Sequence, residues 1–383
     1  MKYPLFKVHI PIKESLNNIE KVLNSGFINE GLQVKKLQNK LIKFLDVKNL
    51  ILTNSCTSAL TLALKISGVE PGTEVITTPM TCIATNTPII NLGAKIVWAD
   101  INPENGSINP LDIEKKITNK TRAIVFVNWA GTPCELEKIS KISKKYKIPT
   151  IQDSAHSFGA TWNNKCISNY IDYTCLSFQA IKHLSTGDGG ALICKSKKSS
   201  NLASKLKWFG FDRNKAKDEK GNWKGQRWSE DIKPEEIGYK FNMNNISASI
   251  GLSQMKYISN LLDLHRRNAK VYSDIFTDES LIKKIDVPPN AKSSYWVYTF
   301  IFNGAESNRD KLIKNLNLEG IGAGLVHLPN DIYSAFKKFK TSLPGTRAFS
   351  ATQISLPCGW WLSSKDCEFI ANRVIKLANK LDN

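Results

Sequence analysis

The chain has 383 residues, of which 42% are hydrophobic and 23% charged, and its formal net charge is +19. This length and composition predict a globular protein with a large core, divided into one large and one smaller domain. The lysines are scattered rather than clustered with aromatic residues, which argues against nucleic acid as a partner. A positive field of this kind would nevertheless attract a phosphorylated or nucleotide-linked substrate.

Several classes of site and location are also disfavoured by the sequence. The eight cysteines form no Cys-x-x-Cys pair, which favours free thiols in a reducing cytoplasm over disulfides or a zinc site. The five histidines show no metal-binding spacing, so no metal is expected. The N-terminus lacks the apolar core of a signal peptide, and no apolar run approaches a membrane span. We therefore expect a soluble cytoplasmic protein with no membrane partner.

Short apolar strands alternate with helical patterns between residues 50 and 195. The predicted strands are Leu50–Leu52, Val75–Thr78, Lys95–Ala99, Ala123–Val127, Thr150–Gln152, Thr174–Phe178 and Ala191–Cys194. The predicted helices are Thr57–Ser67, Pro110–Ile117 and Glu135–Tyr146. This alternation predicts an α/β fold with a mostly parallel sheet, whose ligands gather beyond the carboxyl ends of the strands.

A polar segment rich in Lys, Gly and Trp, residues 212–236, interrupts the alternation and predicts a long insertion. Beyond it the predicted elements are a helix over Ile246–Leu262, a strand over Tyr295–Phe302 and a helical tail over Lys365–Leu381. We therefore assign residues 1–254 to the large domain, with 1–25 as an N-terminal arm, and residues 255–383 to a smaller C-terminal α/β domain.

The most informative feature is a lysine and an acid at the ends of two apolar strands. Lys182 follows one strand and precedes a glycine-rich turn, and Asp153 ends another strand. Pyridoxal 5′-phosphate requires such a pair, because a lysine forms a Schiff base with it and an acid keeps its pyridine nitrogen protonated. We therefore predict Lys182 and Asp153 as the catalytic pair. Once displaced by an incoming amine, the lysine can act as the base in the proton shift.

Neighbouring residues are candidates for holding the rest of this cofactor. His156 follows Asp153 closely enough to touch the cofactor ring or its phenolic oxygen, and a purely structural role is also open. Residues 55–57 (Ser-Cys-Thr) open an apolar helix, whose free amides and dipole suit a phosphate, although Ser55 or Thr57 could equally be a plain helix cap. Ser177 could add a hydroxyl to the phosphate site.

Several segments, taken in order, resemble the DegT/DnrJ/EryC1/StrS family of pyridoxal-phosphate aminotransferases, which act on nucleotide-linked keto sugars. The similar segments are Gly26–Gly31, Asn54–Leu60, Glu74–Thr85, Gly93–Asp100, Asp153–Gly159, Ser177–Gly190, Gly238–Asn244, His327–Pro329 and Ser355–Pro357. No single segment is specific, but their ordered combination is, and it covers nearly the whole chain.

This resemblance implies a type I aminotransferase fold with a seven-stranded sheet, and a homodimer with active sites shared between subunits. In the family an amino acid, usually L-glutamate, converts the cofactor to pyridoxamine 5′-phosphate, and the keto sugar then receives the amine. By motif match Lys182 is the Schiff-base lysine and Asp153 the partner of the ring nitrogen. Ser177 and the amides of Cys56 and Thr57 anchor the phosphate. The product would be an amino sugar for a surface polysaccharide or glycoconjugate.

The sequence departs from the family pattern at a few of these positions. Cys82 stands where the family often carries an aromatic residue that stacks on the cofactor ring. Cys56 replaces the usual glycine, which is tolerable where only the amide is used. Lys240 stands where an asparagine commonly reaches the phosphate of the neighbouring subunit, and lysine could serve there as a charge.

Alternatives to this activity follow from the same residues. One branch of the family has histidine at the lysine position and is a sugar 3-dehydratase. Counted from Ser177, Lys182 falls at the family position and His183 one past it, so transamination is favoured. A transaminase of a small phosphorylated ketone, a dehydratase or other lyase, and a non-catalytic cofactor-binding regulator stay open. Candidate substrate contacts are Trp129, His327 and the 212–236 insertion, which we expect to cover the nucleotide.

Overall fold

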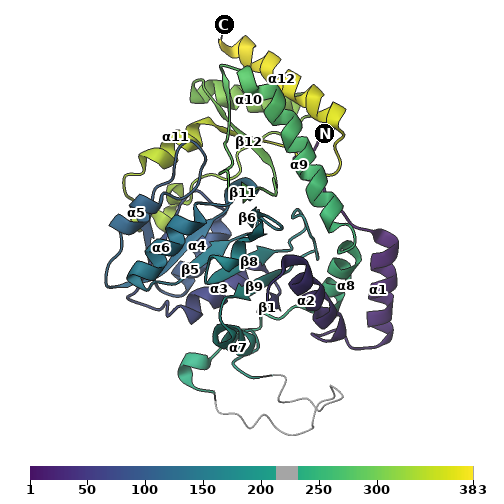
Figure 1. The fold of residues 1–383 in the computed structure, drawn as a ribbon, viewed down its shortest axis with the longest axis vertical. Coiled ribbons are helices and arrows are strands. Elements are labelled where there is room, and N and C mark those ends of the chain that lie inside the picture. Colours follow the sequence, from purple (N-terminus) through teal and green to yellow (C-terminus); the bar gives the residue numbers. More distant parts are fainter. Residues whose placement is uncertain (213–231, 383) are drawn as a thin grey trace.

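The computed structural model describes residues 1–212 and 232–382, and its centre is a seven-stranded sheet (Figure 1). The strands are β1 (Leu50–Thr53), β2 (Glu74–Thr77), β3 (Lys95–Trp98), β4 (Thr121–Val127), β5 (Thr150–Asp153), β8 (Tyr173–Ser177) and β9 (Gly190–Cys194). They lie in the order β1-β9-β8-β5-β4-β2-β3, with β9 antiparallel to both neighbours and all other pairs parallel. The mostly parallel α/β sheet is confirmed, with strand ends that differ from the predicted ones by at most two residues.

Helices cover both faces of this sheet, because its strands are apolar on both sides. The helices that follow strands are α3 (Cys56–Ile66), α4 (Ile83–Asn91), α5 (Pro110–Lys115), α6 (Leu136–Tyr146) and α7 (Lys197–Leu206). In β4, Ala123 and Val125 enter the core that contains α3, whereas Ile124 and Phe126 enter the core that contains α6. The strict alternation of side chains along a strand thus supplies two cores from one run of apolar residues.

Helix α4 was not predicted, and its sequence shows why. It contains Pro88 and several β-branched residues, both of which disfavour a helix in isolation. Burial of Thr85, Asn86 and Ile89 stabilises it in the folded chain, so tertiary packing overrides local propensity.

The single helix predicted over 246–262 is wrong, because the chain forms α8 (Asn245–Gln254) and then α9 (Ile258–Ile275). At the break, the side-chain amide of Gln254 bonds both backbone groups of Ser185, and the hydroxyl of Tyr257 donates to Glu14. These contacts with distant segments turn the chain. The spacing of apolar residues along a helix does not depend on such contacts, so it could not predict the break.

The N-terminal region is more ordered than an arm. It forms α1 (Ile12–Asn24) and α2 (Leu32–Leu45), which pack on α8 beside the large sheet (Figure 1). Tyr3, ahead of both helices, is buried in the core of the C-terminal sheet, so the two ends of the chain lie in the same part of the molecule.

The C-terminal region is built on a smaller antiparallel sheet, β10 (Ile282–Lys284), β12 (Tyr298–Phe302) and β13 (Gln353–Leu356). Helices α9, α10 (Glu306–Leu318) and α12 (Ser364–Asp382) pack around it, and α11 (Pro344–Thr352) leads into β13. A third sheet joins β6 (Thr161–Trp162) and β7 (Lys165–Cys166) to β11 (Ala291–Lys292), so a C-terminal segment pairs with the large domain. The division at residue 254 stays a prediction.

Two further expectations concern the end of the chain and the insertion. The helical tail is confirmed as α12, whereas the strand predicted from Tyr295 begins only at Tyr298, because Tyr295 has a left-handed backbone (φ 46°). Most of the 212–236 insertion lies outside the described residues. Within the described residues, no helix is long and apolar enough to cross a membrane.

Candidate active site

Lys182 and Asp153 are brought together at one edge of the large sheet. Strands β5 and β8 are parallel neighbours, and Asp153 pairs with Cys175 at the carboxyl end of β5. After β8 the chain turns, with the amide of Lys182 donating to the carbonyl of Gln179 at 2.9 Å. The amine of Lys182 lies near enough to the Asp153 carboxylate for that charge to raise its pKa, although burial lowers this pKa by more. The predicted pairing is therefore present in space.

Asp153 is a buried carboxylate held in one orientation. The hydroxyl of Thr85 donates to its Oδ2 at 2.7 Å, and the amide of Ala155 donates to its Oδ1 at 2.9 Å. Burial raises the pKa of Asp153, and these hydrogen bonds oppose that rise. A fixed, desolvated carboxylate of this kind suits the protonated ring nitrogen of pyridoxal phosphate, which would supply the missing counter-charge.

Lys182 is half-buried and unusually easy to deprotonate. Burial is the main cause and lowers the pKa of its amine to about 8, with Asp153, Cys82 and Cys56 acting in the opposite direction. Its Nζ lies 3.4 Å from the centroid of the Trp296 ring. A substantial fraction of the amine is therefore neutral near pH 8, as a nucleophilic lysine requires.

Two histidines present nitrogens without partners beside this lysine. The ring of His156 stacks on Trp296 at 4.0 Å and lies 5.4 Å from the ring of His327. Across the described part of the chain, Nδ1 of His156 and Nε2 of His327 are buried with no hydrogen-bond partner. Burial lowers the pKa of His156 well below its usual range and that of His327 to about 4, so both rings are neutral at pH 7. Orphaned buried nitrogens of this kind mark places where a ligand atom would bind.

The start of α3 forms a cradle suited to a phosphate. Ser55 caps the helix by accepting the amide of Ser58 at 3.0 Å, and the preceding amides of Cys56 and Thr57 lie at a helix start, where no intrahelical carbonyl is available. A Cβ on Gly190 would lie 2.5 Å from the Cys56 nitrogen, so only glycine lets β9 approach this close. Ser177 pairs with Gly190 in the sheet, which places it at the same edge.

The two remaining predicted residues lie in different settings. Cys82 is half-buried at the N-terminus of α4, and its thiol raises the pKa of Lys182, so it belongs to the same pocket. Lys240 is exposed, its Nζ donates to Asn242 at 2.5 Å, and it lies 4.2 Å from the ring of Trp208. The expected contact of Lys240 with a neighbouring subunit stays a prediction.

Sequence reasoning missed Thr85 and Trp296, which touch the catalytic pair from distant segments. Trp129, expected to contact substrate, is only 2% exposed, and its ring meets the edge of His327 at 6.3 Å. Within the described residues its indole Nε1 is also buried without a hydrogen-bond partner, so a contact of Trp129 with substrate stays a prediction. His183 turns toward the backbone of Ser294, with its Nε2 3.0 Å from that carbonyl oxygen.

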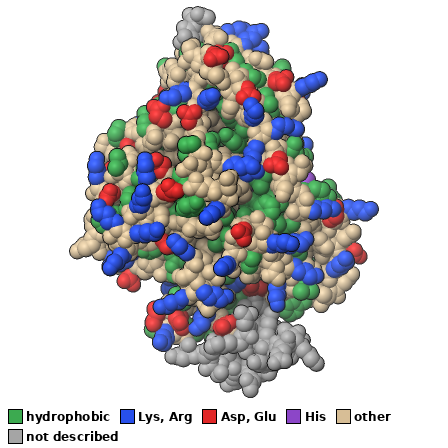
Figure 2. All heavy atoms as spheres, in the orientation of Figure 1, with side chains coloured by type: hydrophobic (Ala, Val, Ile, Leu, Met, Phe, Trp, Pro, Cys, Tyr) green, Lys and Arg blue, Asp and Glu red, His purple; other side chains and the backbone are tan. Residues whose placement is uncertain are grey.

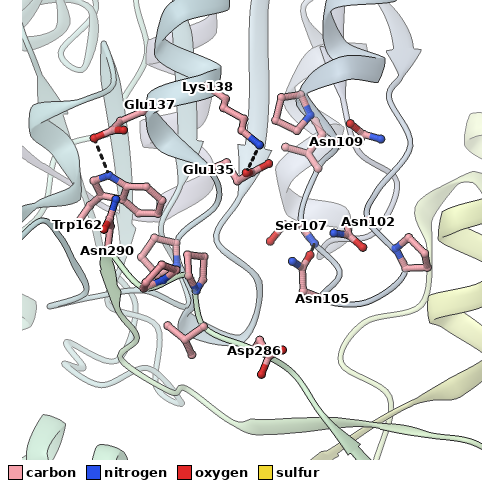
Figure 3. Close-up of a pocket in the computed structure, with 17 residues that line it drawn as sticks. Asn102, Asn105, Ser107, Asn109, Glu135, Glu137, Lys138, Trp162, Asp286 and Asn290 are labelled. Atoms are coloured by element: carbon pink, nitrogen blue, oxygen red, sulfur yellow. Dashed lines mark hydrogen bonds and ion pairs between the residues drawn. The ribbon is translucent and has the colours of Figure 1, made fainter.

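A large hollow of the described structure lies elsewhere (Figure 3). It has a volume of about 790 Å³ and lies between residues 102–110, 133–138 and 286–290. None of the residues that line it belongs to the Lys182–Asp153 pocket. No group of His, Cys, Asp or Glu within residues 1–212 and 232–382 could hold a metal ion.

Comparison with known proteins decides the family. The sequence model of the DegT/DnrJ/EryC1/StrS aminotransferase family matches residues 10–375. The chain belongs to this family. It is 31% identical over 369 residues to the UDP-4-amino-4,6-dideoxy-N-acetyl-beta-L-altrosamine transaminase of Helicobacter pylori, covering 95% of each chain. It is also 28% identical over 385 residues to the spore coat polysaccharide biosynthesis protein SpsC of Bacillus subtilis, covering 97% of this chain and 96% of SpsC.

Solved structures agree with this assignment. The Streptococcus pneumoniae protein Spr1654, in its PLP form, superposes with a TM-score of 0.89 over the full length of both chains at 25% identity. The type I fold, the aminotransferase activity and pyridoxal phosphate as cofactor are therefore confirmed. When bound, this cofactor supplies the electron sink through which an amino group is moved between two substrates. The residues of the pocket fit it, with a lysine, an acid, a helix start and orphaned histidine nitrogens in place.

Proposed function

We propose that this enzyme transfers the amino group of L-glutamate to a nucleotide-linked keto sugar, making an amino sugar for a surface polysaccharide or glycoconjugate. The observation that carries the proposal is the Lys182 amine within electrostatic reach of the buried, hydrogen-bonded Asp153, with the two residues at or beyond the ends of neighbouring strands. The nucleotide-sugar acceptor is supported by a relative that is named for a UDP-linked amino sugar.

Each residue of the pocket has a role that its surroundings support. Lys182 holds the cofactor and, when free, takes up or delivers a proton, which its low pKa permits. Asp153 accepts a hydrogen bond from the protonated ring nitrogen, and Thr85 and Ala155 fix the orientation of its two oxygens. The amides of Cys56 and Thr57, with the hydroxyl of Ser177, bind the phosphate.

The orphaned histidine nitrogens are assigned to polar atoms of the ligands. His156 stacks in the layer of Trp296 beside Lys182, which suits a contact with the cofactor ring or its phenolic oxygen. His327 lies farther out, on the segment that follows β12 and α10, and we assign its Nε2 to the sugar. Because both rings stay neutral, they offer a hydrogen bond without adding charge to the pocket.

We also propose a homodimer, on the evidence of apolar side chains exposed near the phosphate cradle. Ile28, Leu32 and Ile237 are 44%, 61% and 61% exposed. The backbone of Ile28 bonds Asn245, and the backbone of Asn54, just ahead of α3, bonds Phe241 in the same 241–245 segment. The apolar surface is thus joined to the cradle, and a second copy of the chain covering it would complete the site, including the predicted role of Lys240.

The experiment that tests the proposed function is a transamination assay with defined acceptors. Purified enzyme with pyridoxal phosphate and L-glutamate is given either a UDP-linked 4-keto-6-deoxy sugar or dihydroxyacetone phosphate. We expect the nucleotide sugar to be converted, with amino sugar and 2-oxoglutarate formed in equal amounts by mass spectrometry. Conversion of the triose phosphate alone would replace the proposed acceptor by a small phosphorylated ketone. A deoxygenated sugar product without transfer of the amine would contradict transamination.

A further inference from the structure

Trp296 lies under the reactive amine and is fixed on every side. It is 2% exposed, and its ring centroid is 3.4 Å from Nζ of Lys182. Its indole N–H donates to the carbonyl of Ile181 at 2.9 Å, and its backbone N–H donates to the carbonyl of Ala130 at 2.9 Å. The ring is therefore tied to the residue that precedes the lysine as well as to the lysine side chain.

Other aromatic rings stack on this indole from different parts of the chain. The His156 ring lies 4.0 Å away with planes 14° apart, and the Phe6 ring lies 4.7 Å away with planes 25° apart. Phe6 belongs to an N-terminal segment that is itself held by the C-terminal region, because the indole of Trp361 donates to Pro4 and that of Trp360 donates to Lys7. These contacts leave the indole no free rotation about its side-chain bonds.

A lysine that binds and releases a cofactor needs a defined place while its amine is free. In a pocket largely closed to water, an ammonium group loses hydration, so a favourable contact inside the pocket is needed to hold it in one place. An aromatic face attracts the ammonium through its quadrupole, yet it cannot take the proton. The amine held there stays able to deliver its proton or to attack.

We propose that Trp296 is a positioning residue for Lys182, whose ring face holds the amine whenever that amine is not bound to cofactor. This inference rests on the proposed role of Lys182 and adds a residue to it. Phe6 and His156 orient the ring, so the N-terminal segment contributes to the geometry of the site from the far end of the chain.

The test measures the free amine in cofactor-free protein. Acetylation of Lys182 by acetic anhydride is followed by peptide mass spectrometry between pH 6 and 10, and the midpoint of the rate profile gives the protonation equilibrium. The titratable groups that face the amine are Asp153, Cys56, Cys82, His156, His183 and His327. All of them are retained in Trp296 variants, so a shift of the midpoint reports the loss of the ring.

We expect the midpoint of Trp296→Leu to fall by about one pH unit, the size of a desolvated cation–π contact. Trp296→Phe keeps an aromatic face, so its midpoint should fall by less than half as much. Trp98→Leu is the matched control, since Trp98 is equally buried but packs against Phe336. Its midpoint should equal that of the wild type.

An unchanged or raised midpoint in folded Trp296→Leu would overturn the proposal. If that variant does not fold, a midpoint of Trp296→Phe equal to the wild-type value does the same. Failure of the proposed function is separate and is read from wild-type protein loaded with pyridoxal phosphate and reduced with borohydride. Label on another lysine would contradict the role of Lys182. Label on Lys182, together with an acetylation midpoint that Trp296→Leu does not shift, would contradict only the role of Trp296.

Discussion

The pocket around Lys182 and the large hollow of Figure 3 differ in whether their polar groups already have partners. The hollow has room for a substrate, about 790 Å³, but Glu135, Glu137 and Lys138 in its lining are already engaged with protein groups. Glu135 forms an ion pair with Lys138 at 2.5 Å, and Glu137 accepts the indole of Trp162 at 3.3 Å. The Lys182 pocket instead holds a desolvated amine, a desolvated carboxylate and orphaned imidazole nitrogens.

This difference shows that unsatisfied chemistry, more than volume, marks the active site. In the hollow, Asn105 and Asn109 use their side-chain oxygens to fix turns of their own loop, by accepting the amides of Ser107 and Leu111. These side-chain oxygens therefore serve the structure of the loop. The surface charge does not mark the site either. In Figure 2, lysine and arginine side chains are spread over the visible face without gathering at one place. The high net charge therefore does not locate the site.

The largest difference between the Lys182 pocket and the hollow should appear when one lysine is removed from each. Lys182→Ala should abolish covalent capture of pyridoxal phosphate, since no amine remains opposite Asp153. Borohydride reduction followed by peptide mapping should place one label on Lys182 in the wild type and none in the variant. Lys138→Ala, in the hollow, should be labelled like the wild type. Equal labelling of the two variants would contradict the assignment.

Neutralising an acid from each region should separate activity from stability. Asp153→Asn should slow the reaction with L-glutamate by about 100-fold or more, because the ring nitrogen loses its counter-charge. Burial raises the pKa of Asp153 in the folded protein above its value in the unfolded chain. In cofactor-free protein the fold therefore loses stability as the pH rises through the pKa of Asp153 and the buried carboxyl becomes charged. The variant should therefore melt at a higher temperature without cofactor. Glu137→Gln should leave the rate unchanged, and a cofactor-free Asp153→Asn that melts lower would refute the desolvation argument.

The pH dependence of cofactor capture should report the lysine and no histidine. Only the neutral amine attacks, so the capture rate should rise about tenfold per pH unit below pH 8 and level off above the Lys182 pKa of about 8. His156 and His327 are uncharged throughout this range, because burial lowers the pKa of each. Stopped-flow absorbance between pH 6 and 9 measures the profile. A midpoint near 6.5 that disappears in His327→Asn would show that His327, and not Lys182, controls the rate of capture, which would contradict this prediction.

The smallest expected effect concerns the cap of α3. Ser55→Ala removes the acceptor for the amide of Ser58 and should lower the free energy of unfolding by about 1 kcal/mol. Ser196→Ala removes an equivalent cap, 3.0 Å from the amide of Ser199 at the start of α7, and should cost about the same in urea unfolding. Only Ser55→Ala should weaken binding of pyridoxal phosphate by equilibrium dialysis. Equal binding of pyridoxal phosphate by both variants would contradict the assignment of its phosphate to the start of α3.

The sequence predicted the sheet and the catalytic pair because both depend on local signals. Apolar strands such as β4 are short and bounded, and Lys182 and Asp153 each follow one of them. Neighbouring parallel strands necessarily bring their carboxyl ends together, so the pairing followed once the sheet was recognised.

What the sequence did not predict depends on contacts between distant segments. Thr85 lies on α4, a helix that packing stabilises against its own propensities, and its hydroxyl reaches Asp153 across the sheet. Trp296 meets Lys182 only because the C-terminal region folds back on the large sheet, with its backbone bonded to Ala130. No periodicity along the chain records these contacts, nor the break between α8 and α9.

The decisive measurement for Lys182-dependent transamination is the absorption spectrum of the wild-type protein with pyridoxal phosphate, before and after L-glutamate is added without a sugar. We expect a yellow band that is lost on addition of glutamate, as the cofactor becomes pyridoxamine phosphate, and a Lys182→Ala variant that shows no such change. A yellow band that glutamate leaves unmoved, or a Lys182→Ala variant that responds like the wild type, would contradict it.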